Sequence, residues 1–100
     1  MSASGKSQWP IRPTTATLRG YRWLPRLIDK ARAHRRGTLA AGLVYPCLID
    51  RACLESLGTD AEGFADLVAA CSDDHEVLAM LEASGLAGSA AAAFNPDCYL

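Results

Sequence analysis

Apolar positions recur at helical spacing in three stretches of the chain, residues 24–36, 59–70 and 73–84. Successive residues of an α-helix lie about 100° apart, so apolar side chains three and four positions apart share one face. The residues that this spacing places on inward faces are Leu24, Leu27, Ile28, Ala31, Phe64, Leu67, Val68, Val77, Leu78 and Leu81. The residues expected on a solvated face of the first stretch are Arg26, Asp29, Lys30, Ala33 and Arg36. The pattern predicts amphipathic helices around one core.

Residues that favour helix ends lie beside these stretches. Pro25 suits a first helical turn, and Gly37 suits the position just after the last turn of the same helix. Asp50 is the predicted N-cap of a short helix over residues 51–57, which Gly58 ends.

Two further helix starts are predicted in the second half of the chain. The Thr-Asp-Ala-Glu segment at residues 59–62 fits a capping box that opens a helix to about residue 70. Ser72 or Asp73 then caps a helix that runs to about residue 84.

The remaining segments lack this regularity. Residues 1–20 hold two Pro, two Gly and six Ser or Thr, so we expect an irregular arm. Residues 38–49 are apolar but contain one Gly and one Pro, which favours a buried connection over a regular element. We therefore expect an all-α protein: a compact small helical domain of about four helices over residues 21–95, with the irregular N-terminal arm before it and a short tail over residues 96–100.

Composition supports the helical interpretation and limits the class of protein. Half the residues are apolar, eighteen of these fifty are Ala, and only three Val and three Ile occur. Much Ala and Leu with few β-branched residues favours helix over strand. No apolar stretch is long enough for a membrane span, and the first residues lack the apolar segment of a signal peptide. We therefore expect a cytoplasmic protein that has no membrane partner.

The side chains that bind metals show no metal-binding spacing. The four cysteines, Cys47, Cys53, Cys71 and Cys98, contain no CxxC pair, and we interpret them as small buried apolar residues of a reducing compartment. The two histidines are far apart, and neither glycine-rich nucleotide-binding motif occurs. We expect no metal site and no cofactor.

Charge is divided between the two halves of the chain. All ten Lys and Arg lie at or before Arg51, together with two acids, whereas residues 52–100 hold nine acids and no Lys or Arg. The net charge is therefore +8 in the first half and −9 in the second. Such halves attract each other within one molecule, associate between copies as a homo-oligomer, or face different partners. A pI near 6.0 and the acidic second half disfavour nucleic acid as the partner.

Several segments together resemble one protein family. They are LPRLIDKARAHRRGTL at residues 24–39, VYPCLID at 44–50, LGTDAEGFADLV at 57–68 and SDDHEVLAML at 72–81, preceded by Ile11-Arg12-Pro13 and followed by Phe94-Asn95. The combination resembles the DUF5069 family of small bacterial proteins of unknown function, over roughly residues 10–95. The resemblance implies no catalytic residue and no cofactor. This chain departs from the family's pattern after Asn95, where the family continues with polar, charged residues.

One cluster of cations lies where a helix does not favour it. Arg19, Arg22 and Arg26 surround the predicted start of the first helix, where the dipole is positive and backbone N–H groups are unpaired. A phosphate or carboxylate would offset this charge, and it belongs either to a ligand or to an acidic side chain of the second half. We predict a module that binds a small anionic molecule or an acidic protein surface at this place. Asp29 is expected to pair with Arg26 and Arg32.

The predicted binding site extends from the first helix to the segment that follows it. Its candidate residues are Arg19, Arg22, Arg26, Asp29, Lys30, Tyr45, Cys47, Asp50 and Arg51. The alternative is a small enzyme whose acid, base or nucleophile is Asp29, Lys30, Tyr45, Cys47 or Asp50. A third interpretation is a structural or oligomerising module, in which the basic and acidic halves of neighbouring copies meet.

Overall fold

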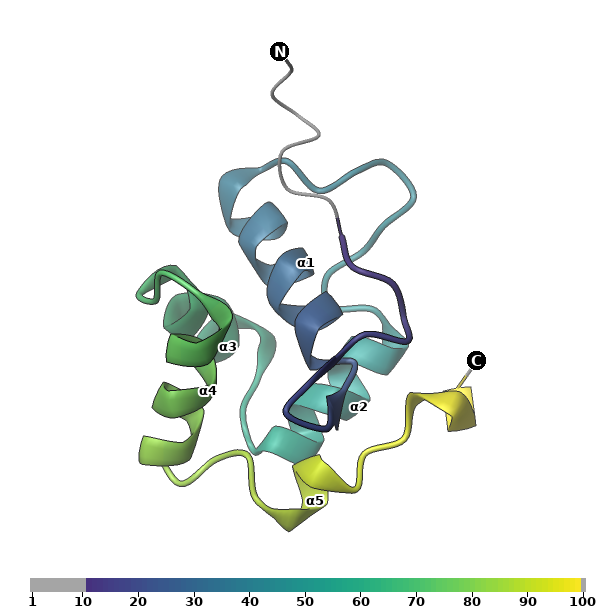
Figure 1. The fold of residues 1–100 in the computed structure, drawn as a ribbon. Coiled ribbons are helices and arrows are strands. Elements are labelled where there is room, and N and C mark those ends of the chain that lie inside the picture. The colour runs from purple at the N-terminus through teal and green to yellow at the C-terminus, as the bar shows by residue number, and fades with distance from the viewer. Residues whose placement is uncertain (1–10, 100) are drawn as a thin grey trace.

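The computed structural model describes residues 11–99, and these residues form five α-helices and one short β-hairpin (Figure 1). In chain order the elements are β1 (Thr17–Leu18), β2 (Tyr21–Arg22), α1 (Leu24–Arg36), α2 (Leu48–Leu57), α3 (Ala61–Ala69), α4 (Asp74–Ala83), α5 (Ser89–Ala92) and a 3-10 helix (Pro96–Tyr99). The expected all-α class is confirmed, because the hairpin contributes only two residues per strand. Residues 1–10 of the predicted arm and Leu100 of the predicted tail lie outside the described residues.

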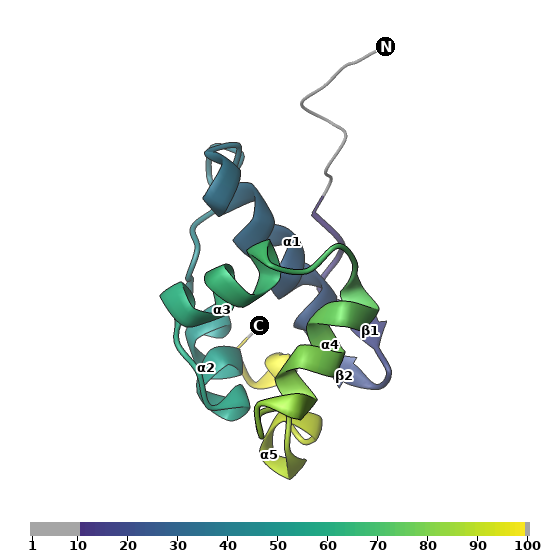
Figure 2. The same ribbon diagram turned by 90° about the vertical axis from the view of Figure 1, so that its left-hand side faces the viewer.

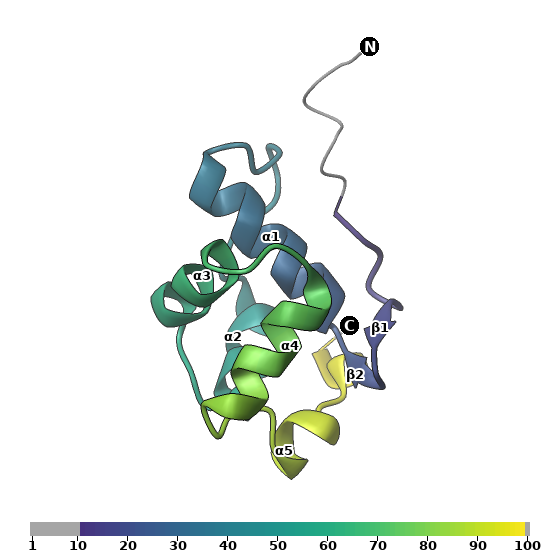
Figure 3. The same ribbon diagram turned by 60° about the vertical axis from the view of Figure 1, so that its left-hand side comes forward.

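Helix α1 lies at the centre of the fold. Helices α3 and α4 contact each other and lie on the same side of α1, in front of it in Figures 2 and 3. The core includes apolar side chains of these three helices that are completely buried, and α2 adds Cys53, Leu54 and Leu57 to it. The completely buried side chains are Leu27, Ile28, Phe64, Val77, Leu78 and Leu81. Burial of a side chain of this size contributes about 1.5–3 kcal/mol to folding. All six belong to the faces that the periodicity predicts as inward.

The ends of α1 follow the sequence signals. Pro25 lies in the first turn, where its missing N–H leaves no helical hydrogen bond unmade. Gly37 follows the last turn with φ +71°, and its N–H donates to the carbonyls of Ala33 and His34. A residue with a side chain is strained at this φ, so glycine fixes where the helix ends.

Helix α2 begins three residues before its predicted start, so Asp50 is not the N-cap. Cys47 is the N-cap: its N–H donates to Asp50 Oδ2 at 3.0 Å, and its Sγ accepts from the Asp50 N–H at 3.5 Å. Asp50 is thus the third helical residue and completes a capping box. The prediction was wrong because cysteine is not among the residue types that favour helix starts. Gly58, with φ +88°, ends the helix as predicted.

Aspartates cap the next two helices. Asp60 Oδ1 accepts the N–H of Gly63 at 2.7 Å, so the cap of α3 is Asp60 and not Thr59, the first residue of the predicted capping box. Asp73 Oδ1 accepts the N–H of Glu76 at 2.8 Å, which confirms the predicted cap of α4. Carboxylates at these positions also favour the positive end of the helix dipole.

Two predictions about exposure are wrong. Lys30 and Ala33 were expected on a solvated face of α1, but they are only 2% and 4% exposed. A central helix has neighbours on more than one side, so its polar positions are covered as well. The segment 38–49 was expected to be buried, yet Val44 is 61% exposed. The chain turns at residues 41–42 instead of lying flat on the core.

The part of the arm nearest the helices is an ordered hairpin, whereas an irregular segment was expected. Strands β1 and β2 pair antiparallel, with Thr17 opposite Arg22 and Leu18 opposite Tyr21. The Tyr21 hydroxyl donates to the carbonyl of Ala87 at 3.0 Å. This bond connects the hairpin to the segment that precedes α5.

The four cysteines are free and differ in environment. Cys53 is buried as expected, and burial raises the pKa of its thiol to about 12. Cys47 and Cys71 are half-buried. Cys98 is exposed, so its interpretation as a buried apolar residue is wrong. Cys98 lies in the short 3-10 helix at the end of the described chain, where little covers it.

Candidate functional site

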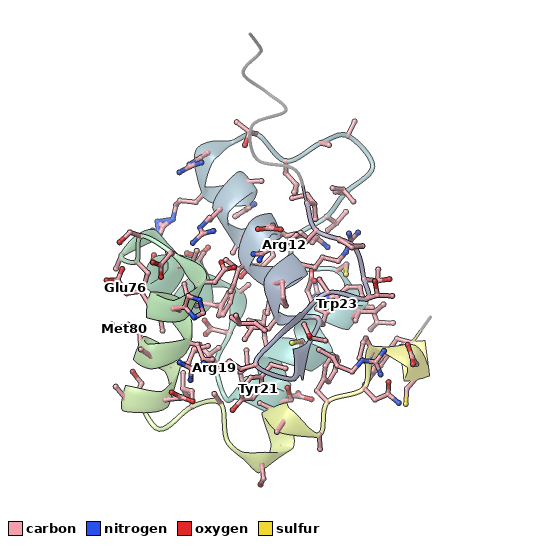
Figure 4. All side chains as sticks on the ribbon, in the orientation of Figure 1. Arg12, Arg19, Tyr21, Trp23, Glu76 and Met80 are labelled. Atoms are coloured by element: carbon pink, nitrogen blue, oxygen red, sulfur yellow. The ribbon has the colours of Figure 1, made fainter. Side chains whose placement is uncertain are left out.

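Two of the three arginines at the start of α1 contact acidic or amide side chains of the second half of the chain. Arg19 Nη1 lies 3.8 Å from Glu82 Oε1, and Figure 4 shows Arg19 beside α4. Arg22 donates from Nη1 to Asn95 Oδ1 at 2.8 Å and from Nη2 to Asp97 Oδ1 at 3.0 Å. The anion predicted beside this cluster is therefore an acidic side chain of the protein itself for both Arg19 and Arg22.

The third arginine covers the start of the helix itself. Arg26 Nη1 donates to the carbonyl of Arg12 at 3.0 Å, and its guanidinium lies 5.5 Å from the ring centroid of Trp23. Trp23 is the N-cap, in a left-handed conformation with φ 72°, and its side chain makes no capping bond. Leu24 and Pro25 of the first turn are buried. The first turn of α1 is therefore closed to a ligand by the arm and by its own side chains.

Arg12 of the arm forms the most extensive polar contact of the described residues (Figure 4). Its backbone N–H and its Nε each donate to Asp29 Oδ2 at 2.8 Å, and its Nη2 donates to Asp29 Oδ1 at 3.0 Å. Its Nη1 and Nη2 donate to the two carboxylate oxygens of Asp74 at 2.5 and 3.2 Å. Nη2 also reaches the carbonyl of Pro25 at 3.2 Å. We call this contact the Arg12 clamp, because it connects the arm to α1 and α4.

The clamp overturns the predicted pairing of Asp29 with Arg26 and Arg32. Neighbours three residues apart on a helix gain only a few tenths of a kcal/mol, whereas a two-point contact with a guanidinium is charge-assisted and geometrically specific. Hydrogen bonds from Arg12 hold the pKa of Asp74 below its ordinary value. Hydrogen bonds to Asp29 and Asp74 raise the pKa of Arg12 above its ordinary value.

Lys30 and Asp50 form a buried ion pair between α1 and α2. Lys30 Nζ lies 2.6 Å from Asp50 Oδ2, and the two side chains are 3% and 0% exposed. Asp50 Oδ1 also accepts the indole N–H of Trp23 at 2.8 Å. With the bond from the N–H of Cys47, the carboxylate receives three donors and has no contact with solvent. This arrangement connects α2 to α1 and leaves neither carboxylate oxygen without a donor.

The remaining predicted site residues, Tyr45, Cys47 and Arg51, do not line one cavity. Tyr45 is buried, its hydroxyl donates to the carbonyl of Ala61 at 2.9 Å, and burial holds the pKa of the phenol above its ordinary value. Arg51 lines a hollow of about 180 Å³ between α2 and the start of α3. The other residues that line it are Pro46, Leu54, Glu55, Thr59, Asp60 and Ala61. The structure brings neither Tyr45 nor Cys47 nor Asp50 to the wall of this hollow.

A second hollow, of about 150 Å³, lies between the C-terminal half of α1 and α3. We call it the arginine hollow; its lining residues are Arg32, Arg35, Arg36, Ala65, Val68, Ala69 and Cys71. Three of these seven are cations and none is an acid. Two acids lie beside these cations: Asp66 Oδ1 pairs with Arg35 Nη2, and Asp74 Oδ1 lies 3.5 Å from Arg32 Nη1. The hollow is thus basic on the α1 side and apolar on the α3 side.

Arg32 is only partly satisfied by its protein neighbours. Its side chain is 17% exposed, and its Nη2 is buried with no hydrogen-bond partner among the described residues. A buried donor without a partner costs about 1–3 kcal/mol, so native structures seldom leave one unpaired without a water or an ion. The other such atom in residues 11–99 is Nε of Arg26, whose guanidinium already contacts Trp23 and the arm.

A third hollow, of about 360 Å³, lies where the arm, α1 and α4 meet. Its lining residues are Arg12, Leu18, Asp29, Arg32, Ser72, Asp73, Asp74 and His75. Charges of both signs line it, and most of them are engaged in the Arg12 clamp. Arg32 lines both this hollow and the arginine hollow.

Sequence reasoning missed Arg12 and Arg32, the two cations at the centre of these contacts. Arg32 was treated only as a partner of Asp29. A signal for the arginine hollow does exist, because Arg32, Arg35 and Arg36 are spaced by three and four residues and therefore share one face of α1. No comparable signal exists for Arg12, whose partners are 17 and 62 residues away.

Two kinds of site find no support in the part of the chain that the structure describes. No group of three or more His, Cys, Asp and Glu in residues 11–99 is placed to hold a metal ion. No helix formed by these residues is both long enough and apolar enough to cross a membrane.

Comparison with known proteins shows the family of the chain. No curated protein matches it, and no solved structure matches it. The model of the domain of unknown function DUF5069 matches residues 8–94, which include the Arg12 clamp, the buried ion pair and all three hollows. The chain therefore belongs to the DUF5069 family.

Proposed function

We propose that this protein is a small helical binding module for a ligand that carries a phosphate or carboxylate group, and that the anion binds in the arginine hollow. The observation that carries the proposal is the buried Nη2 of Arg32, a charged donor with no partner among the described residues, which belongs to a side chain that lines the hollow. We thus propose the same kind of function as the sequence predicts, but we place the binding site near the end of α1 instead of its start.

The chemistry of the hollow suits such a group. A guanidinium offers several N–H donors in one plane, which match the paired oxygens of a carboxylate or phosphate. An anion that reaches Arg32 would accept a hydrogen bond from Nη2. It would recover part of the free energy, about 1–3 kcal/mol, that a buried donor without a partner costs. On the opposite wall, Ala65 and Val68 are buried and apolar, so they offer no competing charge.

The start of α1 supports the same function less well. Arg19 and Arg22 already face Glu82, Asn95 and Asp97. An anionic ligand there would have to displace those side chains, and the first two residues of the helix, Leu24 and Pro25, are buried. In the arginine hollow, a ligand would add a partner to Arg32.

The size of the hollow sets the kind of ligand. A volume of about 150 Å³ accommodates one phosphate or carboxylate with a small apolar group, which would lie against the alanines of α3. A free anion and an acidic side chain on a partner protein present the same group. Binding of a free anion by the isolated protein would show that the hollow accepts this group. We also propose that the protein is cytoplasmic, as expected from the sequence. Its four free cysteines support this location, because thiols stay reduced there.

The test is an anion titration at constant ionic strength. Sodium phosphate, sulfate and acetate would each replace chloride while the melting temperature is followed by thermal shift. A ligand that binds only the folded state adds about 2.7 kcal/mol of stability at one hundred times its Kd. We expect at least one anion to stabilise the protein beyond chloride, and Arg32→Gln to remove this stabilisation.

The matched control is Arg51→Gln, which removes one exposed arginine from a different hollow. It should keep the anion-dependent stabilisation, as should Arg22→Gln at the start of α1. Two results would contradict the proposal: no anion stabilises the wild-type protein, or Arg51→Gln reduces the effect as much as Arg32→Gln does. Loss of the effect in Arg22→Gln alone would return the site to the start of the helix.

A further inference from the structure

One carboxylate lies between the arginine hollow and the Arg12 clamp. Asp74 Oδ1 accepts from Arg12 Nη2 at 3.2 Å and lies 3.5 Å from Nη1 of Arg32. Asp74 Oδ2 accepts from Arg12 Nη1 at 2.5 Å. Arg12 belongs to the arm and Arg32 to the wall of the arginine hollow, so the two cations share this counter-ion, and Arg12 has a second one in Asp29.

We infer that anion binding in the arginine hollow and docking of the arm are coupled through Asp74, so that a bound anion tightens the Arg12 clamp. The inference rests on the proposed function, because it concerns the regulation of the same site. It assigns a role to the arm: the arm adjusts the affinity of a site that it does not line.

The physical reason is competition for one carboxylate. Without a ligand, Asp74 divides its charge between Arg12 and Arg32, and the two like-charged guanidinium groups repel each other across it. An anion in the arginine hollow draws Arg32 toward itself and offsets its charge. Asp74 then pairs with Arg12 alone, and the repulsion between the guanidinium groups of Arg12 and Arg32 decreases. The Arg12 clamp therefore becomes more stable when Arg32 moves from Asp74 to the bound anion.

Coupling of this kind is reciprocal. If an anion strengthens arm docking by some factor, a docked arm strengthens anion binding by the same factor. Removal of Arg12 leaves Arg32 as the only cation on Asp74, which holds Arg32 away from the ligand. Removal of the Asp74 carboxylate frees Arg32 entirely. The two substitutions are therefore expected to act in opposite directions on affinity.

The experiment measures the Kd of inorganic phosphate for four proteins: wild type, Arg12→Gln, Asp74→Asn and the double variant. Ion pairs of this exposure change an equilibrium constant by about two- to fivefold. We expect Arg12→Gln to weaken phosphate binding by about that factor and Asp74→Asn to strengthen it. In the Asp74→Asn background, Arg12→Gln should have no further effect, because the shared counter-ion is gone.

The double variant separates coupling from a general effect of charge. Loss of a positive charge would weaken anion binding in any background, so an effect of Arg12→Gln that persists in Asp74→Asn overturns the inference. Glu76→Gln is the matched control for Asp74→Asn. It removes a carboxylate from the same end of α4 that bonds Ser72 and no arginine. An increase in affinity as large as that of Asp74→Asn would also overturn the inference.

A second measurement follows the arm directly. Hydrogen exchange of the backbone over residues 11–18 should slow when phosphate saturates the wild-type protein, and it should not slow in Asp74→Asn. Unchanged exchange in the wild type overturns the coupling. If phosphate does not bind the wild type at all, both proposals fail. If it binds with the same Kd in all four proteins, only the coupling fails.

Discussion

Replacement of Asp50 by Asn should destabilise this protein more than any other single charge removal among the described residues. The substitution keeps the shape of the side chain and removes its charge. In the native protein, the carboxylate accepts from Lys30, from the indole of Trp23 and from the N–H of Cys47, at 2.6, 2.8 and 3.0 Å. Both members of the ion pair are buried, at 3% and 0% exposure of their side chains.

The expected magnitude follows from what the amide cannot do. An Asn side chain has one acceptor oxygen, so it cannot satisfy three donors that approach two oxygens. Lys30 would remain buried without a counter-charge, and breaking a buried pair in this way costs about 3–5 kcal/mol. A domain of this length has a total stability of about 5–15 kcal/mol. Asp50→Asn should therefore remove a large share of it.

Urea unfolding at 25 °C, followed by circular dichroism at neutral pH, measures the change in unfolding free energy. Asp66→Asn is the matched control, because Asp66 pairs with Arg35 at an exposed position on α3. Loss of an exposed pair should cost less than about 1 kcal/mol. Lys30→Met combined with Asp50→Asn should recover part of the loss, because the double variant leaves no unpaired buried charge.

The reasoning is refuted if Asp50→Asn costs no more than Asp66→Asn. It is also refuted if the double variant is as unstable as the sum of the two single variants. Additivity would mean that Lys30 and Asp50 do not interact in the folded protein. The buried pair would then be two separate polar groups, each satisfied by other neighbours.

Three further results are expected. The lowered pKa of Asp74 means that its ionised form stabilises the fold, fully above the ordinary carboxyl range and less as pH falls through the lowered value. The stability difference between wild type and Asp74→Asn should thus shrink from about pH 6 to pH 3 in urea unfolding, and a constant difference would contradict this. Iodoacetamide should modify exposed Cys98 in the native protein and spare Cys53, as peptide mass mapping would show; equal labelling would be the contrary result. Gly58→Ala should cost about 1 kcal/mol or more, because φ is +88° and an added Cβ would lie 3.3 Å from a leucine methyl. Gly88→Ala, at φ −82° in open space, is its control and should cost less.

The helices of this protein are largely determined by local signals in the sequence. Apolar spacing and the glycines at positions 37 and 58 predict α1, α3, α4 and the end of α2 correctly, because helix formation and helix termination depend on residues within four positions of each other. The start of α2 escaped prediction, since a cysteine cap gives no recognisable signal. The family is determined by the sequence as well, through a match that covers residues 8–94.

The exposure of polar residues was decided by tertiary structure. Lys30 occupies the polar side of an amphipathic pattern and would be solvated on an isolated helix. It is buried because Asp50, on another helix, approaches it and supplies the counter-charge that makes burial tolerable. Periodicity describes one helix at a time, so it cannot show which of its polar positions a second helix will cover.

In the candidate site, too, some features follow from the sequence and others only from the tertiary structure. The sequence alone determined that the two halves carry opposite charge and that a cluster of arginines lies along the first helix. Only the tertiary structure decided which arginines keep an unpaired buried donor, namely Arg26 and Arg32. Arg12 pairs with Asp74, which lies 62 residues away in the chain, and Arg32 pairs with the same carboxylate. Such choices depend on distances of a few ångströms between elements that are far apart in the chain, and those distances are set by how the helices pack.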